Sequence, residues 1–289
     1  MKRLCILLAL PIALSVASLG QSTRSTSQVN PSATKSDTTW RLVWADEFNT
    51  DGAPDATNWA FEKGFVRNHE AQWYQTQNAR CEKGMLVIEA RKEHRPNPTY
   101  KANSTDWKTS RPTIDYTAAS LNTQGLHSWQ YGRFEMRGRI DIRPGLWPAF
   151  WTLGVAGEWP ANGEIDIMEY YRNMLLANVA WATPKRYTAE WRSVKKPMNS
   201  FNDPDWSTKF HVWRMDWDET AIRLYVDGQL LNAVNLSETI NQDGSGKNPF
   251  HQPHYLLLNL AVGGDNGGDP LAASFPSRFE VDYVRVYQR

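Results

Sequence analysis

The sequence predicts an all-β fold, one large sandwich, from three observations. Short runs of alternating apolar and polar residues, bounded by Gly, Pro, Asn and Asp, recur along the chain after residue 40. Such alternation is typical of strands that bury one face. No sustained helical periodicity interrupts the runs, and the last 250 or so of the 289 residues are enough to enclose one core. We therefore expect a single β-rich domain over residues 40–289.

The expected strands follow one another along this domain. They are Met85–Ala90, Gly132–Ile142, Phe210–Asp216, Ala221–Val226 and Phe279–Tyr287. Asp227-Gly228 follows one of them directly and has the composition of a two-residue hairpin turn. The glycine-rich stretch 263–270 lacks a Walker lysine, so we interpret it as a mobile loop near the functional cleft rather than a phosphate-binding loop.

The N-terminal segment predicts export. Residues 1–20 combine a short basic start with an apolar run, as a signal peptide does, and the run is shorter than the ~20 apolar residues that a membrane span needs. Residues 21–39 are rich in Ser, Thr, Asn and Gln and cannot bury enough apolar surface to offset their ordering entropy, so we expect a flexible tether. The domain is thus expected in the periplasm, at the cell surface or outside the cell.

Charge and cysteine content limit the partners. Loss of Cys5 with the leader leaves only Cys81, so no internal disulfide is expected. The formal charge of +1 gives no electrostatic preference for nucleic acid or for an anionic membrane. We expect a monomer with neither of these partners.

One strand-like segment carries three carboxylates, Glu164, Asp166 and Glu169. Side chains alternate faces along a strand, so Glu164 and Asp166 share one face while Glu169 has the wrong parity. An unbroken strand would bury Glu169 among isoleucines at a cost of several kcal/mol. One extra residue near Ile167 or Met168 would form a β-bulge and turn all three acids toward one cleft.

The three acids are suited to acid/base chemistry, since mutual repulsion raises the pKa of at least one of them. Retaining glycosidases place their two carboxyl groups about 5 to 5.5 Å apart, and inverting enzymes about 6.5 to 9.5 Å. With a bulge, Glu164 and Glu169 are about four strand steps apart, roughly 13 Å between backbones, and their long side chains can close most of that gap. The spacing permits retention, and Asp166 lies between the two, where it can hydrogen-bond Glu164.

Indole side chains crowd the region beside the acids. They lie in the stretches 145–154 and 158–162. Aromatic faces stack on the apolar faces of sugar rings, and their N–H groups satisfy hydroxyls. A solvated edge strand with salt bridges would explain the acids alone, but this aromatic context favours a carbohydrate site.

Further motifs extend the pattern over the whole domain. They are Leu42–Phe48, Asn68–Tyr74, Leu86–Arg91, Tyr131–Arg137, Leu257–Gly264 and Val281–Tyr287. With these motifs in this order, the chain resembles glycoside hydrolase family 16, most closely its laminarinase-like branch. The resemblance implies a β-jelly roll of two stacked antiparallel sheets with a cleft across the concave face.

The resemblance also implies a role for each acid. Glu164 would be the nucleophile, Asp166 its assisting acid, and Glu169 the general acid/base of a double displacement with retention. Members of the branch that have a residue like Met168 carry the bulge, in agreement with the parity argument.

Substrate contacts follow from the same resemblance. Trp151 and Trp159 would flank the scissile bond, and Asn68 would contact sugars in the minus subsites. Many laminarinase-like members have a histidine on the next strand, and its match here is Trp181, which can stack on a sugar or narrow the cleft but cannot relay a proton. We interpret residues 191–197, with their cationic and aromatic groups, as a surface loop rather than an acidic-sugar site.

No cofactor is expected for catalysis. The six histidines do not form a zinc pattern. The resemblance implies a structural calcium ion on the convex face, held by Asp282 with main-chain oxygens of Glu47 and Gly84, and hard oxygen ligands suit that ion.

The expected function is a secreted, endo-acting, retaining β-glycan hydrolase that binds a polysaccharide or oligosaccharide, foremost an endo-β-1,3(4)-glucanase. The alternatives are an endo-β-galactan hydrolase (agarase-like, galactanase or O-glycan endo-β-galactosidase), a transglycosylase, and a non-catalytic glycan-binding module. The intact trio of acids disfavours the binding module, because binding alone needs no coupled carboxylates.

Overall fold

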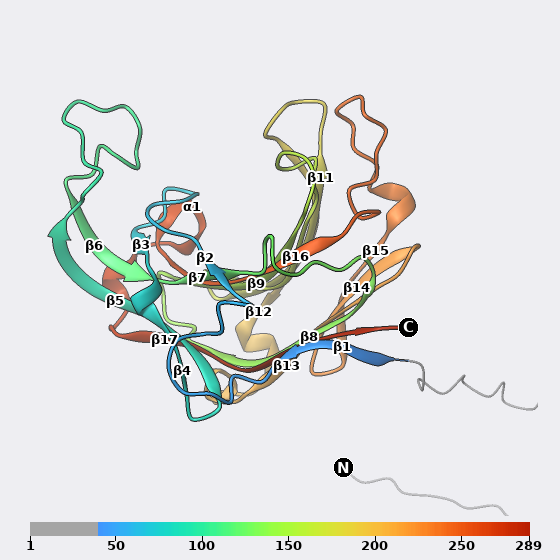
Figure 1. Cartoon of the computed structure of the whole chain (residues 1–289), viewed down its shortest axis with the longest axis horizontal. Helices are drawn as coiled ribbons and strands as arrows, with labels where there is room; N and C mark the ends of the chain where they lie inside the picture. Colours follow the sequence, from blue (N-terminus) through green and yellow to red (C-terminus); the bar gives the residue numbers. More distant parts are fainter. Residues whose placement is uncertain (1–39) are drawn as a thin grey trace, which may run out of the picture. The chain divides into compact units, whose positions relative to one another are not determined.

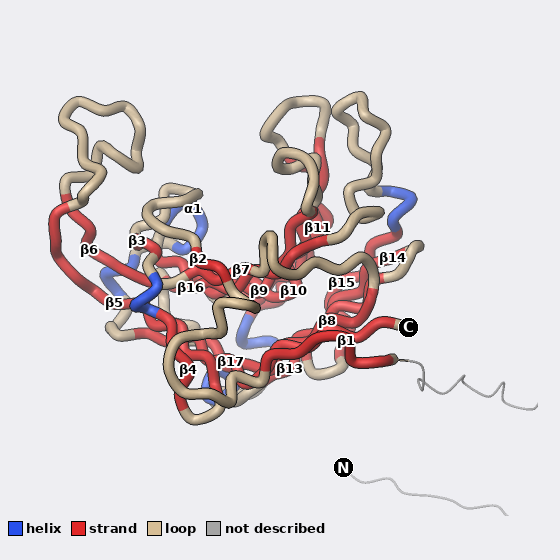
Figure 2. The backbone as a smooth tube through the Cα atoms, in the orientation of Figure 1, coloured by secondary structure: helices blue, strands red, loops and turns tan. Residues whose placement is uncertain are grey.

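Strands dominate the part of the chain that the computed structural model describes, residues 40–289 (Figures 1 and 2). The expected signal peptide and tether lie outside the described residues. Within residues 40–289 the single α-helix is α1 (Gly264–Gly267). The 3-10 turns are η1 (Thr76–Asn78), η2 (Met198–Phe201), η3 (Trp206–Thr208), η4 (Leu236–Glu238) and η5 (Pro270–Ala272). The all-β prediction is confirmed, and no helix between residues 40 and 289 could cross a membrane.

The first sheet has ten strands. Eight follow the order β15 (Gln229–Asn235), β14 (Ala221–Val226), β13 (His211–Trp217), β8 (Gly132–Ile140), β17 (Ser277–Gln288), β5 (Met85–Pro96), β6 (Thr113–Ala118) and β3 (Gln72–Tyr74). In addition, β1 (Arg41–Asp46) pairs with β17, and β4 (Ala79–Glu82) pairs with β5. All pairs in this sheet are antiparallel except β3 with β6.

The second sheet has seven strands and carries the residues of interest. Its order is β12 (Ala189–Pro197), β11 (Met174–Ala182), β10 (Glu164–Tyr171), β9 (Leu146–Gly154), β16 (His254–Val262), β7 (Ser120–Asn122) and β2 (Ala60–Phe61). Figure 1 shows β9 and β16 lying over β8, β13 and β17 of the first sheet. Apolar side chains of both sheets, such as Phe134 and Val284 from one and Ile165 and Leu258 from the other, form one buried cluster between the layers. The two-sheet sandwich is therefore as expected.

Local predictions held to different degrees. The strand Ala221–Val226 is confirmed, and Asp227-Gly228 forms the hairpin turn to β15 with positive φ at both residues, 49° and 78°. The interpretation of residues 191–197 as a loop is wrong, because they pair with β11 along their length and form most of β12. The stretch 263–270 contains α1 and is tied to its surroundings through Asp265, whose N–H donates to Asn68 O at 2.9 Å.

Candidate active site

β10 contains the bulge that the parity of its acids required. Asp166 and Glu169, three positions apart on β10, lie opposite residues that are only two apart on both neighbouring strands. The extra residue makes Ile167 and Met168 point consecutively into the core, where both are fully buried. Glu169 consequently returns to the face of Glu164 and Asp166. The predicted bulge is confirmed, and the three acids share one face.

Two tryptophans hold the outer acids. Trp159 donates its indole N–H to Glu164 Oε2 at 2.5 Å, and Trp147 donates to Glu169 Oε1 at 2.7 Å. Hydrogen bonds to a carboxylate are roughly twice as strong as neutral ones and favour its charged form. Each indole therefore orients its acid and offsets part of the cost of burying it.

Asn178 on β11 links Asp166 and Glu169. Its Nδ2 donates to Asp166 Oδ2 and to Glu169 Oε2, both at 2.9 Å, and the residue is buried. Sequence reasoning missed Asn178. Strand alternation could have suggested it, because Asn178 lies directly opposite Asp166 and cross-strand partners share a face.

The same register corrects the interpretation of Trp181 as a sugar contact. Glu164 lies opposite Ala180, so the odd-numbered neighbours Val179 and Trp181 point into the core. Trp181 is 1% exposed and belongs to the buried cluster between the sheets. A side chain on the core face cannot stack on a substrate in the cleft.

Burial raises the pKa of all three acids. That of Glu169 rises to about 7, because burial outweighs the hydrogen bond from Trp147 and the charge of Glu164 adds to the rise. The pKa of Asp166 lies well above its ordinary value, first through burial and then through the charges of Glu164 and Glu169. For Glu164 burial also raises the pKa, but hydrogen bonds from Trp159 and Asp166 oppose it. Glu164 is thus the acid whose anion receives most support, whereas Asp166 and Glu169 retain protons more readily.

A pocket of about 410 Å³ opens over the acids. Its lining includes the expected residues Glu164, Asp166, Glu169, Trp151, Trp159 and Asn68. It also includes Arg67, Glu70, Trp147, Ala149, Leu153, Trp191, Asn259 and Asn266, which sequence reasoning did not single out as site residues. Arg67, Glu70, Asn259 and Asn266 come from segments distant from β10 in the chain, so no local pattern marks them, whereas Trp147, Ala149 and Leu153 belong to the indole-rich stretch 145–154.

Trp151 forms part of the pocket floor and is fixed from two sides. Its indole N–H donates to Asn259 Oδ1 at 2.7 Å on the neighbouring strand β16. The guanidinium of Arg67 lies over its ring, 5.1 Å from the centroid, and Arg67 forms an ion pair with Glu62. The ring is therefore held in one orientation before any sugar arrives.

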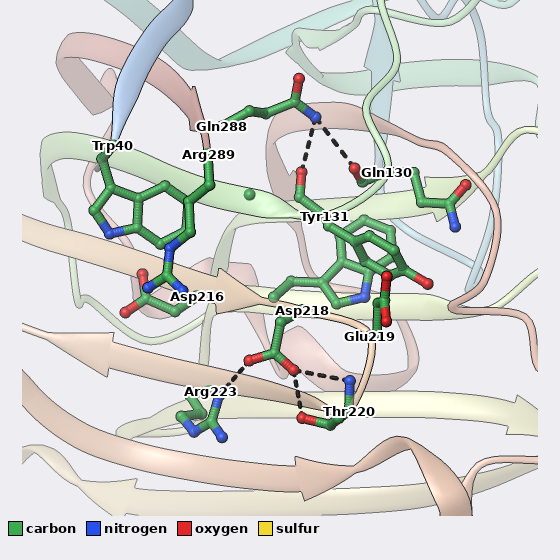
Figure 3. A pocket seen from close by; sticks show the side chains of 12 residues that line it. Trp40, Gln130, Tyr131, Asp216, Asp218, Glu219, Thr220, Arg223, Gln288 and Arg289 are labelled. Atoms are coloured by element: carbon green, nitrogen blue, oxygen red, sulfur yellow. Dashed lines mark hydrogen bonds and ion pairs between the residues drawn. The ribbon is translucent and has the colours of Figure 1, made fainter. Parts of the chain in front are cut away.

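A larger hollow, of about 710 Å³, lies between the ends of β1, β8, β13 and β17 (Figure 3). It contains none of the predicted site residues. Asp218 in its lining accepts from the Thr220 N–H at 2.8 Å and from Arg223 at 3.0 Å. The Trp40 ring has the guanidinium groups of Arg133 and Arg289 within 5 Å of its centroid. Several of its charged and aromatic groups are thus engaged with one another.

The side chains of Asp282 and Glu47, at the expected calcium site, have protein partners. Asp282 forms an ion pair with Arg137 at 2.5 Å, so the one side chain offered to the ion is already neutralised by a guanidinium. The Glu47 side chain pairs with both Nε and Nη2 of Arg285, at 2.7 and 2.8 Å. Between residues 40 and 289 no three His, Cys, Asp or Glu side chains are grouped around a common metal position. The calcium site stays a prediction, and Asp282 would have to exchange Arg137 for the ion.

Comparison with known proteins agrees with the geometry. The family model described as glycosyl hydrolases family 16 matches residues 66–285. A beta-glucanase of Rhodothermus marinus is 37% identical over 265 residues, which are 86% of this chain and 85% of that protein.

Solved structures agree as well. A structure from work on endo-acting O-glycanases, which members of the human gut microbiota express to initiate mucin breakdown, superposes with a TM-score of 0.77 at 34% identity, covering 86% of this chain and 91% of the other. The laminarinase catalytic domain of Thermotoga petrophila gives 0.72 at 34% identity, with 86% and 98% covered. The chain therefore belongs to glycosyl hydrolase family 16 and is a glycoside hydrolase.

Proposed function

We propose that the enzyme cleaves β-1,3- or mixed-linkage β-1,3(4)-glucan internally and with retention of configuration. The observation that carries the proposal is the gathering of Glu164, Asp166 and Glu169 on one face by the bulge, each with its own hydrogen-bond environment. The beta-glucanase and laminarinase named above support this substrate class.

Glu164 acts as the nucleophile in this mechanism. The Trp159 N–H, the hydrogen bond from Asp166 and the charge of Arg67 all favour its anion. A carboxylate oxygen of Glu164 attacks the anomeric carbon and forms a covalent glycosyl ester as the bond to the leaving sugar oxygen breaks. Because the Asp166 carboxyl holds its proton against two neighbouring acids, it can donate that hydrogen bond to Glu164.

Glu169 acts as the general acid and then as the base. With a pKa of about 7 it still holds a proton near neutral pH and gives it to the departing oxygen. The carboxylate left behind keeps the hydrogen bonds from Trp147 and Asn178. It then takes a proton from water, whose oxygen bonds to the anomeric carbon and releases Glu164.

The sugar itself would lie on the aromatic walls. Trp151 and Trp159 line the pocket together with the acids, and Asn68 adds an amide to the lining. Export through residues 1–20 suits this function, because a polymeric glucan has to be cut outside the cytoplasm.

A second candidate is hydrolysis of β-linked galactose in O-glycans. The O-glycanase structure superposes with a TM-score of 0.77, against 0.72 for the laminarinase at the same 34% identity. The acids and their roles would be the same, and only the sugar contacts would differ.

A product-release assay decides between the two. The enzyme is incubated with laminarin, mixed-linkage glucan, galactan and mucin glycans, and new reducing ends are measured, with Glu164→Gln as the inactive control. Proton NMR of the first product reports its anomeric configuration. Release from laminarin as the β anomer supports the leading proposal. Release from mucin glycans alone moves the assignment to the second candidate, and a first product in the α configuration contradicts retention.

A further inference from the structure

The edge strand β12 presents one face to the catalytic cleft. Its pairing with β11, and that of β11 with β10, places three rows of residues across the sheet: Glu164–Ala180–Trp191, Asp166–Asn178–Ser193 and Glu169–Leu176–Lys195. Residues directly opposite one another in an antiparallel sheet lie on the same face. Each of the three acids therefore shares its row and its face of the sheet with a side chain of β12, two strands away.

The distance between β12 and the acids suits a contact with the sugar next to the scissile bond. Neighbouring strands lie about 4.8 Å apart, so the β12 backbone is about 10 Å from that of the acids, and the long side chains of Trp191 and Lys195 reach back over part of this span. Trp191 lines the same pocket as Glu164 and is 40% exposed. An open indole face at the pocket edge is a platform for a sugar ring.

The basic side chains of β12 lie on opposite faces of the strand. Arg192 and Lys196 point away from the cleft and are engaged: Arg192 pairs with Glu190 at 3.5 Å, and Lys196 donates to Gln229 at 2.9 Å. The Lys195 side chain points the other way, is exposed, and has no ion-pair or hydrogen-bond partner between residues 40 and 289.

An unpaired ammonium in this place has an electrostatic consequence. The Glu164 carboxylate in the cleft repels an anionic substrate, and a cation on the same face offsets that repulsion. Burial raises the pKa of Glu169, and the charge of Lys195 acts in the opposite direction, so its field extends into the cleft.

We propose that Trp191 and Lys195 form a subsite for a sugar with an anionic substituent, such as a sulfate ester, beside the sugar at the scissile bond. Trp191 stacks on the ring, Ser193 adds a hydroxyl between the two, and Lys195 binds the charged group. The inference deepens the proposed function and rests on it, since it specifies which form of the β-glycan is preferred.

The test compares two polysaccharides that share one glucan backbone, laminarin and partially sulfated laminarin. The kcat/KM of wild type, Lys195→Met and the matched control Lys196→Met is measured on both polysaccharides. We expect the ratio of sulfated to neutral kcat/KM to fall about two- to fivefold in Lys195→Met, the size of one exposed ion pair, and to be unchanged in Lys196→Met. Any effect of Lys195 on the pKa of Glu169 changes kcat/KM for both polysaccharides alike and cancels in the ratio.

Two further measurements distinguish binding of the anionic group by Lys195 from a structural role. Raising NaCl from 0.05 to 0.5 M should remove most of the preference of wild type but not that of Lys195→Met, because salt screens an exposed pair. Trp191→Ala should raise KM for both polysaccharides to a similar extent and independently of salt. An equal loss in the two lysine variants, or a ratio that Lys195→Met leaves unchanged, would overturn the proposal.

Failure of the proposed function gives a different result. If neither laminarin is cleaved, the glucan assignment is wrong, and the same ratio is measured on mucin O-glycans before and after chemical desulfation. A fall of about two- to fivefold in that ratio in Lys195→Met still supports the subsite. If wild type shows no preference for the sulfated member of either pair, the subsite is refuted.

Discussion

Replacing Glu169 with glutamine removes the proton for the leaving oxygen while keeping the shape of the side chain. In the wild type Trp147 donates to Oε1 at 2.7 Å and Asn178 to Oε2 at 2.9 Å. An amide has one acceptor oxygen, so one of these donors loses its partner at a cost of about 1.5–3 kcal/mol. Loss of general acid catalysis lowers the rate by roughly 10²- to 10⁴-fold.

The same substitution changes how stability depends on pH. The pKa of Glu169 is raised from 4.5 to about 7, so the folded protein binds this proton more tightly than the unfolded chain does. The stability that the bound proton contributes is complete below pH 4.5 and is lost as pH rises through about 7. At about 1.4 kcal/mol per pKa unit the loss is on the order of 3 kcal/mol. Glu169→Gln cannot ionise and should lack this loss, so relative to wild type it gains stability between pH 4.5 and 8.

Two assays measure these effects. Hydrolysis of the polysaccharide is followed from pH 5 to 9, and urea unfolding is measured at pH 4.5 and 8. Wild-type kcat/KM should decline above about pH 7, whereas the residual activity of the variant should lack that limb. An aryl glycoside whose leaving group needs no proton should restore much of the glycosylation rate. Glu190→Gln, a half-buried carboxylate outside the pocket, is the control. A variant that keeps more than a tenth of wild-type activity on polysaccharide would show that Glu169 is not the general acid, and an equal stability relative to wild type at both pH values would show that its pKa is not raised.

Three further substitutions test the other parts of the site. Glu164→Gln should lower kcat by several orders of magnitude on both polysaccharide and aryl glycoside, and Asp166→Asn should cost less; equal losses measured by steady-state kinetics would contradict the division of roles. Asn178→Ala removes a donor to the Glu169 carboxylate and should shift the basic limb of the pH profile upward by about one unit, whereas an unshifted limb would show that this hydrogen bond does not set the pKa. Trp181→Phe should lower the free energy of unfolding in a urea titration by about 1–3 kcal/mol, because the indole is in the core, and leave KM unchanged; a large rise in KM would return this residue to the cleft.

The bulge in β10 could be predicted from the sequence because it follows from local parity and the cost of burying a charge. Glu164 and Glu169 are five positions apart, which a regular strand would place on opposite faces. With apolar residues between the acids, burying Glu169 would cost several kcal/mol, and one extra residue is the inexpensive alternative. Strand alternation and turn composition predicted Ala221–Val226 and its hairpin for the same reason: each depends on neighbours in the chain.

The partners of the acids were decided by the tertiary structure. Asn178 faces Asp166, and Trp181 faces the core, because of the register between β10 and β11, and a shift of one residue would exchange these faces. Residues 191–197 form an edge strand because β11 supplies hydrogen bonds that their own polar sequence does not reveal. Arg67 and Asn259 meet at Trp151 from opposite parts of the chain. The sequence by itself therefore determined the acids and the face they occupy, whereas strand pairing, which depends on residues far apart, decided what surrounds them.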